Sequence, residues 1–347
     1  MAEGILDIFN DDAFSVTNLT DAINELTYTP GHISELGIFT EESVDTTTIA
    51  IEKKGNIVIV VPPSPRGGVG TTVAKEKRDL LPLAIPHFEI IDAIMAEEVQ
   101  GVRAFGRGQQ LMTVAQKIAQ RQNMHVMSMA VTEEAARLGA VQGIITYADG
   151  SQLNLYTQFG VSKIDTINFD LTNATPASGA LRRACAAVIR MVANELGGVP
   201  FRGLRAQCGD NFFDALLAHK EVRDTYKNWN AAQILRDAYI GPNRSVYGIF
   251  EFGGIIWENY RGSDSLDVKI NTNHCAIFPE GVPGLFRTVY APADYEDTVN
   301  TMGQRLYNRI YPMENGKGRN FSVQMNALQY CTRPRVLLDG KRAAADA

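Results

Sequence analysis

FGRGQQLMTVAQKIAQRQNMHVMSMAVTEEAARL, residues 105–138, is the stretch that decides most about the fold of this chain. Between Gly108 and Gly139 it contains neither proline nor glycine. Its mostly apolar core positions recur every three or four residues, as one face of an α-helix requires. These positions are Leu111, Ala115, Ile118, Gln122, Val126 and Met129. The pattern predicts one helix of about 30 residues, well above the usual globular length, with Gly139 as its C-terminal cap.

The segment before this helix, residues 48–91, predicts a long hairpin loop. The run TTTIAIEKKGNIVIVV, residues 46–61, is β-branched and alternates partly around Lys54-Gly55-Asn56, which indicates strand, turn and strand. Three prolines follow at once and exclude regular ladder pairing there. Strand-like sequence resumes in TTVAKEKRDLLPLAIPHFEI, residues 71–90.

The sequence after the helix alternates short strands with helices. GIITYADGSQLNLYTQFGV, residues 143–161, contains two strand runs around Asp149-Gly150, a strong hairpin signal. A second helix is predicted over 177–197, ending at Gly197-Gly198. Further helices are predicted over 211–226 and 230–239. Strands are predicted in 201–210, 246–260 and 274–279, and two long closing strands are predicted in 301–312 and 318–338. This arrangement predicts an α+β fold.

Composition places the chain among ordinary soluble globular proteins. It has 347 residues, of which 45% are hydrophobic and 21% charged, and a net charge of -6. No apolar run approaches the roughly 18–20 residues of a membrane span, and the first residues lack the basic region of a secretory signal. Four cysteines without a CxxC pair indicate reduced, buried thiols. They are Cys185, Cys208, Cys275 and Cys331.

Charge is distributed unevenly. From Met1 to Glu52 there is no lysine or arginine, whereas acidic residues, among them Asp11 and Asp12, recur throughout. The C-terminal end is instead rich in arginine and lysine. Electrostatic potentials of opposite sign at the two ends favour contacts between the acidic end of one subunit and the basic end of its neighbour. Asp11 and Asp12 are therefore candidate inter-subunit contacts. A solvated acidic terminus without any partner explains the same pattern, and both interpretations stay open at this point.

The motif RGGVGTT, Arg66–Thr72, resembles the phosphate loop KGGVGKT of partition-type ATPases, in which glycine N–H groups cradle phosphates. However, Thr71 occupies the position of the required lysine, and Arg66 replaces the other one. No strand ending in a magnesium-binding aspartate follows at a suitable distance. We therefore interpret Arg66, Gly67, Gly68 and Gly70 as a mobile loop crown and a candidate contact with a neighbouring subunit.

Other candidate catalytic groups have simpler structural explanations. Asp210, Asp214 and His219 suit an N-cap and a surface pair, and Cys208 has no paired histidine or oxyanion motif. Glu133 and Glu134 are adjacent on the long helix and do not face each other, which predicts a solvated face. The five histidines show no metal-ligand spacing. We expect no catalytic site, no cofactor and no metal.

The order of elements is similar to that of the major capsid protein E family of lambda-like tailed bacteriophages. The resemblance covers nearly the whole chain and is densest from residue 142 onward. The strings that carry it are ITYADGSQLNLYTQFGV at 145–161, FEFGGIIWENYRG at 250–262, HCAIFPEGVPGLFRTVYAPADYEDTVNT at 274–301 and QRLYNRIYPMENGKGRNFSVQMNALQYCTRPRVLL at 304–338. They are diffuse structural strings without a catalytic signature.

The resemblance implies the tailed-phage major capsid protein fold, with five parts. These are an N-terminal arm (1–48), an extended loop (49–91), a peripheral domain (92–175) with the spine helix 105–138, an axial domain (176–277), and return strands with a C-terminal tail (278–347). The short arm implies a separate scaffolding protein rather than a fused one. Another branch of the fold joins subunits by a Lys–Asn isopeptide bond, and no such pair is identifiable in this sequence.

In function, the resemblance implies self-assembly into hexamers and pentamers of an icosahedral shell that packages double-stranded DNA without sequence-specific binding. Further partners are a portal protein and a candidate decoration protein, and no membrane is expected. The expected locations are the virion capsid and, during assembly, the host cytoplasm. Two alternatives remain: the shell protein of a bacterial nanocompartment with the same fold, and a nucleotide-binding enzyme that uses residues 66–72.

Overall fold

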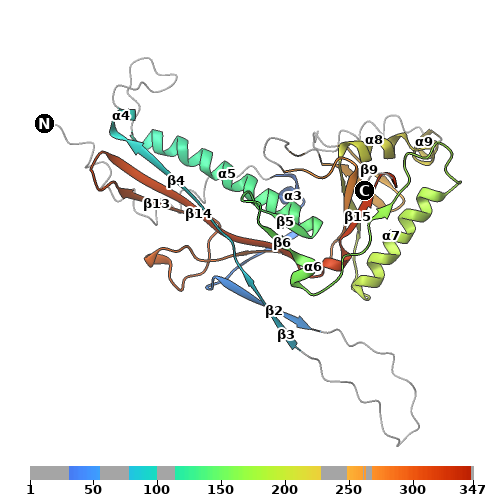
Figure 1. Ribbon diagram of the computed structural model, residues 1–347, viewed down its shortest axis with the longest axis horizontal. Helices are drawn as coiled ribbons and strands as arrows, with labels where there is room; N and C mark the ends of the chain where they lie inside the picture. The colour runs from blue at the N-terminus through green and yellow to red at the C-terminus, as the bar shows by residue number, and fades with distance from the viewer. Residues whose placement is uncertain are drawn as a thin grey trace, which may run out of the picture.

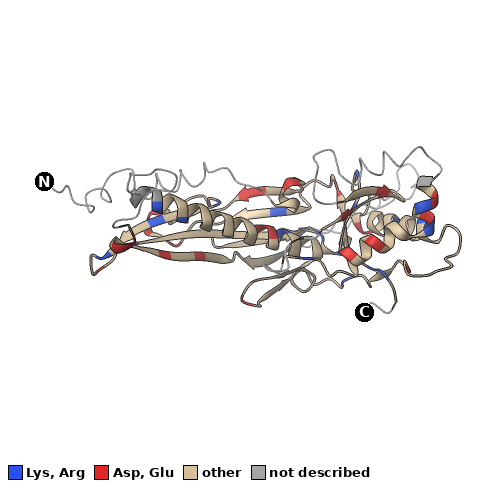
Figure 2. Cartoon of the chain, turned by 90° about the horizontal axis from the view of Figure 1, so that it is seen from above, with Lys and Arg blue, Asp and Glu red and all other residues tan. Residues whose placement is uncertain are grey.

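The structure is a computed structural model that describes residues 31–54, 78–99, 114–227, 248–260, 262 and 268–344. The molecule is elongated (Figure 1). A long sheet and one long helix occupy one end, and a second, more compact sheet flanked by shorter helices occupies the other. Seen from above in Figure 2, charged residues of both signs are scattered along its whole length.

The long sheet is built around β14 (Gly318–Cys331), the longest strand of the described residues. Its strand order is β1-β12-β14-β13, and β4 pairs with β14 as well. The first half of β14 is antiparallel to both β13 and β4, and its second half is antiparallel to β12. The partner strands are β1 (Phe39–Ser43), β4 (His87–Met95), β12 (Phe286–Tyr290) and β13 (Tyr307–Pro312).

The long helix α5 (Val114–Gln142) lies along this sheet and confirms the prediction of one very long helix. Val126 and Met129 pack onto Val323 and Met325 of β14. The expected start at residue 105 lies outside the described residues. The expected C-cap at Gly139 is wrong: the helix continues to Gln142, and Gly143 has the positive φ of +83°.

Gly139 is a glycine for a different reason. A Cβ atom at Gly139 would lie 2.8 Å from the Cα atom of Ile145 and 3.0 Å from the carbonyl oxygen of Ile144. The absence of a side chain therefore lets the hairpin of β5 (Ile144–Thr146) and β6 (Gln152–Asn154) fold back closely against the helix. The hairpin turns through Asp149 and Gly150, with φ +82° at the glycine, as predicted.

The second sheet has the strand order β7-β15-β11-β8-β10-β9. It contains the main hydrophobic core, in which Trp257, Phe212 and Phe169 form an aromatic cluster. Strands β7 and β15 pair into this sheet although the predicted boundaries assign them to the peripheral parts; the domain boundaries stay a prediction. The strands are β7 (Ile167–Asn168), β8 (Gly203–Cys208), β9 (Ile249–Phe252), β10 (Ile255–Asn259), β11 (His274–Glu280) and β15 (Leu338–Lys341).

Helices flank the second sheet. The predicted helix over 177–197 is present as α7 (Ala180–Leu196), and it ends at Gly197 in the left-handed conformation, as expected. The predicted helix over 211–226 is divided at His219 into α8 (Asp210–Ala218) and α9 (Lys220–Lys227). The helix predicted over 230–239 lies outside the described residues. The described residues also contain the short helices α4 (Ala96–Val99) and α6 (Leu155–Gln158) and two 3-10 turns at Glu296–Thr298 and Pro334–Val336.

The hairpin predicted over 48–91 begins as an antiparallel ribbon of β2 (Thr48–Lys54) and β3 (Arg78–Ala84). Thr48 is opposite Ala84, and Lys54 is opposite Arg78. The ribbon leads away from the body of the molecule in Figure 1. The turn expected at 54–56 and the crown at 66–72 lie outside the described residues, and the observed partner of β2 is β3.

Residues 31–44 belong to the body of the subunit although the arm was expected to run to residue 48. The helix α3 (His32–Glu35) packs on α5, and Ile33 is fully buried. β1 then pairs in parallel with β12, with Phe39 opposite Phe286. This segment therefore connects the long helix, the long sheet and the second sheet.

Candidate functional site

The contact residues suggested by the sequence lie outside the described residues. This applies to Arg66, Gly67, Gly68 and Gly70 of the loop crown and to Asp11 and Asp12 of the acidic segment. Their role in subunit contacts stays a prediction. The described part of the molecule offers a different candidate surface, at the base of the ribbon that leads to the crown.

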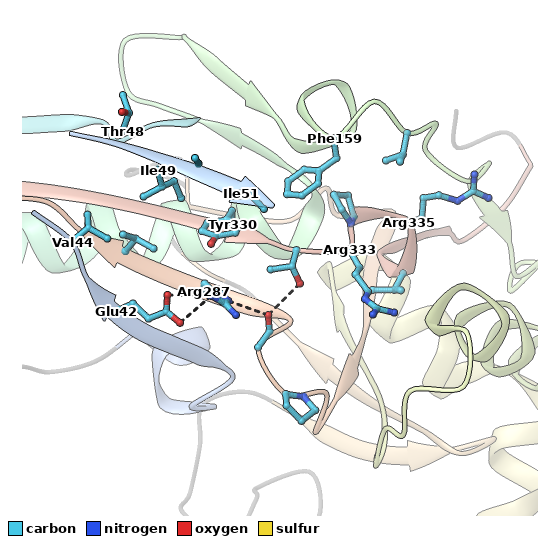
Figure 3. A pocket seen from close by; sticks show the side chains of 18 of the residues that line it. Glu42, Val44, Thr48, Ile49, Ile51, Phe159, Arg287, Tyr330, Arg333 and Arg335 are labelled. Atoms are coloured by element: carbon cyan, nitrogen blue, oxygen red, sulfur yellow. Dashed lines mark hydrogen bonds and ion pairs between the residues drawn. The ribbon is translucent and has the colours of Figure 1, made fainter. Parts of the chain in front are cut away.

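This surface is a groove of about 1100 Å³ between β2 and the end of the long sheet, which we call the ribbon-base groove. Figure 3 shows Ile49 and Ile51 of β2 on one side, with Tyr330 and Arg287 below them. Phe159, which follows α6, lies just beyond Ile51, between it and the arginines Arg333 and Arg335. The residues that line the groove include Glu42, Val44, 48–51, Phe159, Glu195, Arg287, Val289, Tyr330, Arg333, Arg335 and Val336.

The strand register explains why these side chains meet. Successive side chains of a strand point to opposite faces, so Arg287 and Val289 of β12 share the groove face. Tyr330 of β14 is directly opposite Arg287. Glu42 of β1 is next to Val289 in the parallel pair and reaches Arg287, with 3.0 Å between its Oε1 and the Nη1 of the arginine.

The rim of the groove is ionic. Arg335 forms a bidentate pair with Glu195 of α7, with N–O distances of 2.8 and 2.9 Å. Arg333 donates a hydrogen bond from Nη1 to the carbonyl oxygen of Leu196 at 3.0 Å. No carboxylate of the described residues forms an ion pair with Arg333, and its side chain is exposed. The groove thus has apolar walls and an arginine that is not neutralised by a described carboxylate.

On the opposite face of the long sheet, the buried residues Glu133, Arg137 and Tyr290 form a polar centre. Arg305 and the exposed Glu41 join it from the outside. Glu133 binds Arg137 at 2.7 Å and Arg305 at 2.9 Å, and the Tyr290 hydroxyl donates to it at 2.8 Å. Burial alone would lower the pKa of Arg137, but the adjacent carboxylates raise it. Burial and the Glu133 charge raise the pKa of Tyr290. Arg137 therefore stays charged and Tyr290 stays a neutral phenol that can donate its hydrogen bond.

Glu134 has a different set of partners. It accepts hydrogen bonds from the backbone N–H of Ile33 at 2.6 Å, from the N–H of Ser34 at 3.1 Å, and from the Tyr260 hydroxyl at 3.3 Å. The expectation that Glu133 and Glu134 form a solvated face is wrong. Their exposed fractions are 0% and 6%, because α3 and the sheets cover both sides of the helix.

A second buried network lies beside α3. His32 Nε2 is 2.7 Å from Glu258 of β10, and Glu258 also binds Arg205 at 2.9 Å and Gln207 at 2.7 Å. Burial alone would raise the pKa of Glu258, but His32, Arg205 and Gln207 together lower it. Glu280 binds the same Arg205. The network links α3 to the second sheet through the contact between His32 and Glu258.

The residues that the sequence offered as catalytic candidates make contacts that support the fold. Asp210 accepts a hydrogen bond from Asn259, and Gly209, rather than Asp210, is the N-cap of α8. The expected surface position of His219 is wrong: it is 4% exposed, and burial lowers its pKa. Cys208 is buried opposite Cys275, whose pKa is raised by burial and by Cys208.

Within the described residues, no group of three or more histidines, cysteines and acids is placed to hold a metal ion. The four cysteines are free and buried, as expected. No helix among these residues is long and apolar enough to cross a membrane.

Comparison with known proteins identifies relatives over nearly the full length. The family model of phage major capsid protein E matches residues 15–342. The major capsid protein of Pseudomonas phage KPP10 is 26% identical over 95% of this chain and 97% of its own length. That of Salmonella phage Felix O1 is 26% identical over 94% of this chain and 95% of its own.

A solved structure shares the fold at low sequence identity. It is the putative capsid protein of a prophage of E. coli CFT073, with a TM-score of 0.54 and 11% identity. The match covers 99% of this chain and 100% of that protein.

Proposed function

This chain belongs to the phage major capsid protein E family, and from that premise we propose that its copies assemble into hexamers and pentamers of an icosahedral shell around double-stranded DNA. The chain is a major capsid protein of tailed phages, and its α+β fold is the tailed-phage capsid fold. Assembly in the host cytoplasm before release as the virion capsid is part of the same proposal.

The observation that carries the proposal is the β2–β3 ribbon. It leads away from the body, and within the described residues it pairs with no other sheet. β2 carries Ile49 and Ile51 at alternate positions. Ile49 and Ile51 pack partly against the body, but a two-stranded ribbon is only marginally stable by itself, and its free strand edges associate readily. A neighbouring copy that covers the ribbon removes both problems, and closed rings with this contact can tile a shell.

We further propose a purely structural role without catalytic turnover. Asp210, His219 and Cys208 make structural contacts, and the family is one of structural capsid proteins. A separate scaffolding protein and a portal protein are proposed as partners, with a decoration protein as a further candidate. A nanocompartment shell of the same fold is the alternative container, but the family and both curated relatives are phage proteins.

Size-exclusion chromatography with light scattering, followed by electron microscopy of the purified full chain, tests this function. The proposal predicts hexamers, pentamers or closed shells. A chain that stays monomeric at high concentration and shows nucleotide hydrolysis would contradict it.

A further inference from the structure

Two cysteines face each other in the middle of the second sheet. Strands β8 and β11 are neighbours in this sheet, and Cys208 of β8 is directly opposite Cys275 of β11. Both residues are buried, with exposed fractions of 0% and 1%, and both thiols are free. The four cysteines of the chain all lie in described residues, and only these two occupy paired strand positions.

The ladder pattern places the pair at the closest type of cross-strand position. The Gly209 N–H donates a hydrogen bond to the carbonyl oxygen of His274 at 2.9 Å, so these two residues, one step along from the cysteines, form a hydrogen-bonded pair. Hydrogen-bonded and non-hydrogen-bonded pairs alternate along an antiparallel ladder, which makes Cys208 and Cys275 a non-hydrogen-bonded pair. Pro279 occupies the same kind of position further along β11 and needs no N–H donor there. The Cα atoms of such pairs are about 4.5 Å apart, within the roughly 4.4–6.8 Å that a disulfide spans.

The surrounding residues hold the two thiols in contact. The Cys208 side chain forms a hydrogen bond with Cys275, and burial together with this contact raises the pKa of the Cys275 thiol. On its other side, Cys275 is opposite Gly340 of β15. A Cβ atom at Gly340 would lie 2.6 Å from the Cys275 sulfur and 2.6 Å from the Phe169 ring. The Cys275 sulfur is therefore enclosed between Cys208 and the β15 side of the sheet.

The other two cysteines have different neighbours. Cys185 of α7 packs against Gly253, where an added Cβ atom would lie 2.7 Å from the Cys185 Cβ. Cys331 of β14 is opposite Phe286. Burial raises the pKa of each of these thiols to about 12. Thiols of this kind are inert, so Cys185 and Cys331 serve as internal references for the pair.

A small cavity adjoins the pair. Residues 274–276 of β11 line a cavity of about 190 Å³, whose walls also include Tyr156, Lys163 and Asp339. A water molecule occupies about 30 Å³ of the liquid, so this cavity can hold a molecule of the size of hydrogen peroxide. A peptide disulfide such as oxidised glutathione is too large for it. The cavity therefore favours a small peroxide as the oxidant.

We propose that Cys208 and Cys275 are a redox modification site, which a peroxide converts from two thiols into a disulfide that joins β8 to β11. The first thiol, as its thiolate, attacks one peroxide oxygen; the O–O bond breaks, and a sulfenic acid and water result. The second thiol attacks the sulfenic sulfur; the S–S bond forms, and the S–O bond breaks to release a second water. Two thiols are oxidised, and one peroxide is reduced to two waters.

The disulfide would stabilise the second sheet outside a reducing compartment. Thiols stay reduced in the cytosol and form disulfides in oxidising surroundings. The bond closes a loop of roughly 70 residues that contains α8, α9, β9 and β10, and restricting so long a loop in the unfolded chain raises stability. Both strands belong to one chain, so the inference goes beyond the proposed function and does not depend on it.

Oxidation of the folded full chain tests the proposal. The chain is treated with hydrogen peroxide at pH 8.5, because thiolate formation favours the reaction. Remaining thiols are blocked with N-ethylmaleimide in urea, and unreduced peptides are identified by mass spectrometry. The proposal predicts a linked pair of peptides that contain Cys208 and Cys275, lighter by two hydrogen atoms than the separate peptides. Oxidised glutathione should give the same link far more slowly.

The melting temperature gives a second measurement on the same chain. Oxidation should raise it by roughly 5 °C, and dithiothreitol should reverse the rise. Cys208→Ala should show neither the link nor the rise, which separates the disulfide from other effects of peroxide. Cys331→Ala, which removes a buried thiol outside the pair, is the matched control and should keep both. The comparison of oxidised and reduced wild-type chain remains decisive if a variant does not fold.

The contrary results are specific. Cys208 and Cys275 that stay open to N-ethylmaleimide after peroxide treatment, or that end as sulfinic acids without a link, would overturn the proposal. A link that lowers the melting temperature would also overturn it, because the strands would then not accept a disulfide in their native geometry. None of these results changes the particle state of the reduced chain, which tests the proposed function separately.

Discussion

Glu134 of the long helix accepts a hydrogen bond from the backbone N–H of Ile33 at 2.6 Å, across a sequence separation of 101 residues. The same carboxylate binds the backbone and hydroxyl of Ser34 and the Tyr260 hydroxyl. One side chain thus joins α3, the long helix and the segment that follows β10. It fixes residues 33 and 34 against the long helix.

Replacing Glu134 tests how much these hydrogen bonds stabilise the fold. Glu134→Ala leaves the N–H groups of Ile33 and Ser34 without their charged acceptor, at roughly 1.5–3 kcal/mol for each such hydrogen bond. We expect the free energy of unfolding to fall by about 3 kcal/mol in urea titrations, and residues 31–44 to become sensitive to protease. Glu35→Ala, at an exposed position of the same turn, is the control. Equal stability of the two variants would show that Glu134 does not hold α3.

The buried Glu258 predicts a specific pH dependence. Its pKa in the folded chain is below the ordinary 4.5, so its stabilisation is present above pH 4.5 and is lost as pH falls through the lower folded value. The difference in unfolding free energy between wild type and Glu258→Gln should therefore be largest near pH 7 and shrink below about pH 4.5. Glu314→Gln, in an exposed turn, should show no such trend. A difference that grows toward acid pH would contradict the charge network with His32 and Arg205.

Gly139 gives a prediction in which packing opposes helix propensity. In an exposed helix, glycine to alanine gains about 1 kcal/mol. Here the added Cβ would lie 2.8 Å from the backbone of Ile145, so Gly139→Ala should lower the melting temperature. Ser128→Ala, at an exposed position of the same helix, should be neutral or slightly stabilising. A more stable Gly139→Ala variant would mean that the β5–β6 hairpin is not packed this closely.

Deletion of residues 1–20 separates folding from assembly. The described contacts of α3, β1 and the long sheet begin at residue 31, so the truncated chain should fold. It should fail to close regular shells, and assembly of the full chain should weaken as salt rises, because exposed charge pairs are screened. Circular dichroism and electron microscopy measure the two effects. Normal shells from the truncated chain would show that the acidic segment is passive.

Local patterns in the sequence predicted most elements of the fold. The spacing in α5, the Asp149-Gly150 hairpin and the glycine end of α7 all follow from neighbouring residues alone, and the structure confirms them. The predicted end of α5 was wrong because the sequence does not distinguish a glycine that ends a helix from a glycine that allows another segment to pack closely against it. Only the contact with Ile145 distinguishes them.

The buried charges and the groove depend on contacts between distant segments. Glu133 and Glu134 have an ordinary solvated-helix pattern, and their partners Arg305, Tyr290 and Ile33 are far away in the chain. The groove requires β2, β12 and residues 333–336 to meet, which no local spacing reveals. The alternation along β12 does predict that Arg287 and Val289 share one face of the strand. It does not predict that β2 and residues 333–336 face them across a groove.

The central claim is that this chain is an assembling shell subunit, and the particle state of the purified full chain tests it most directly. Light scattering coupled to chromatography, with electron microscopy of the same fractions, should show closed uniform shells or five- and six-membered rings. A single folded monomer across the concentration range, with no rings or shells on the grids, would contradict the account.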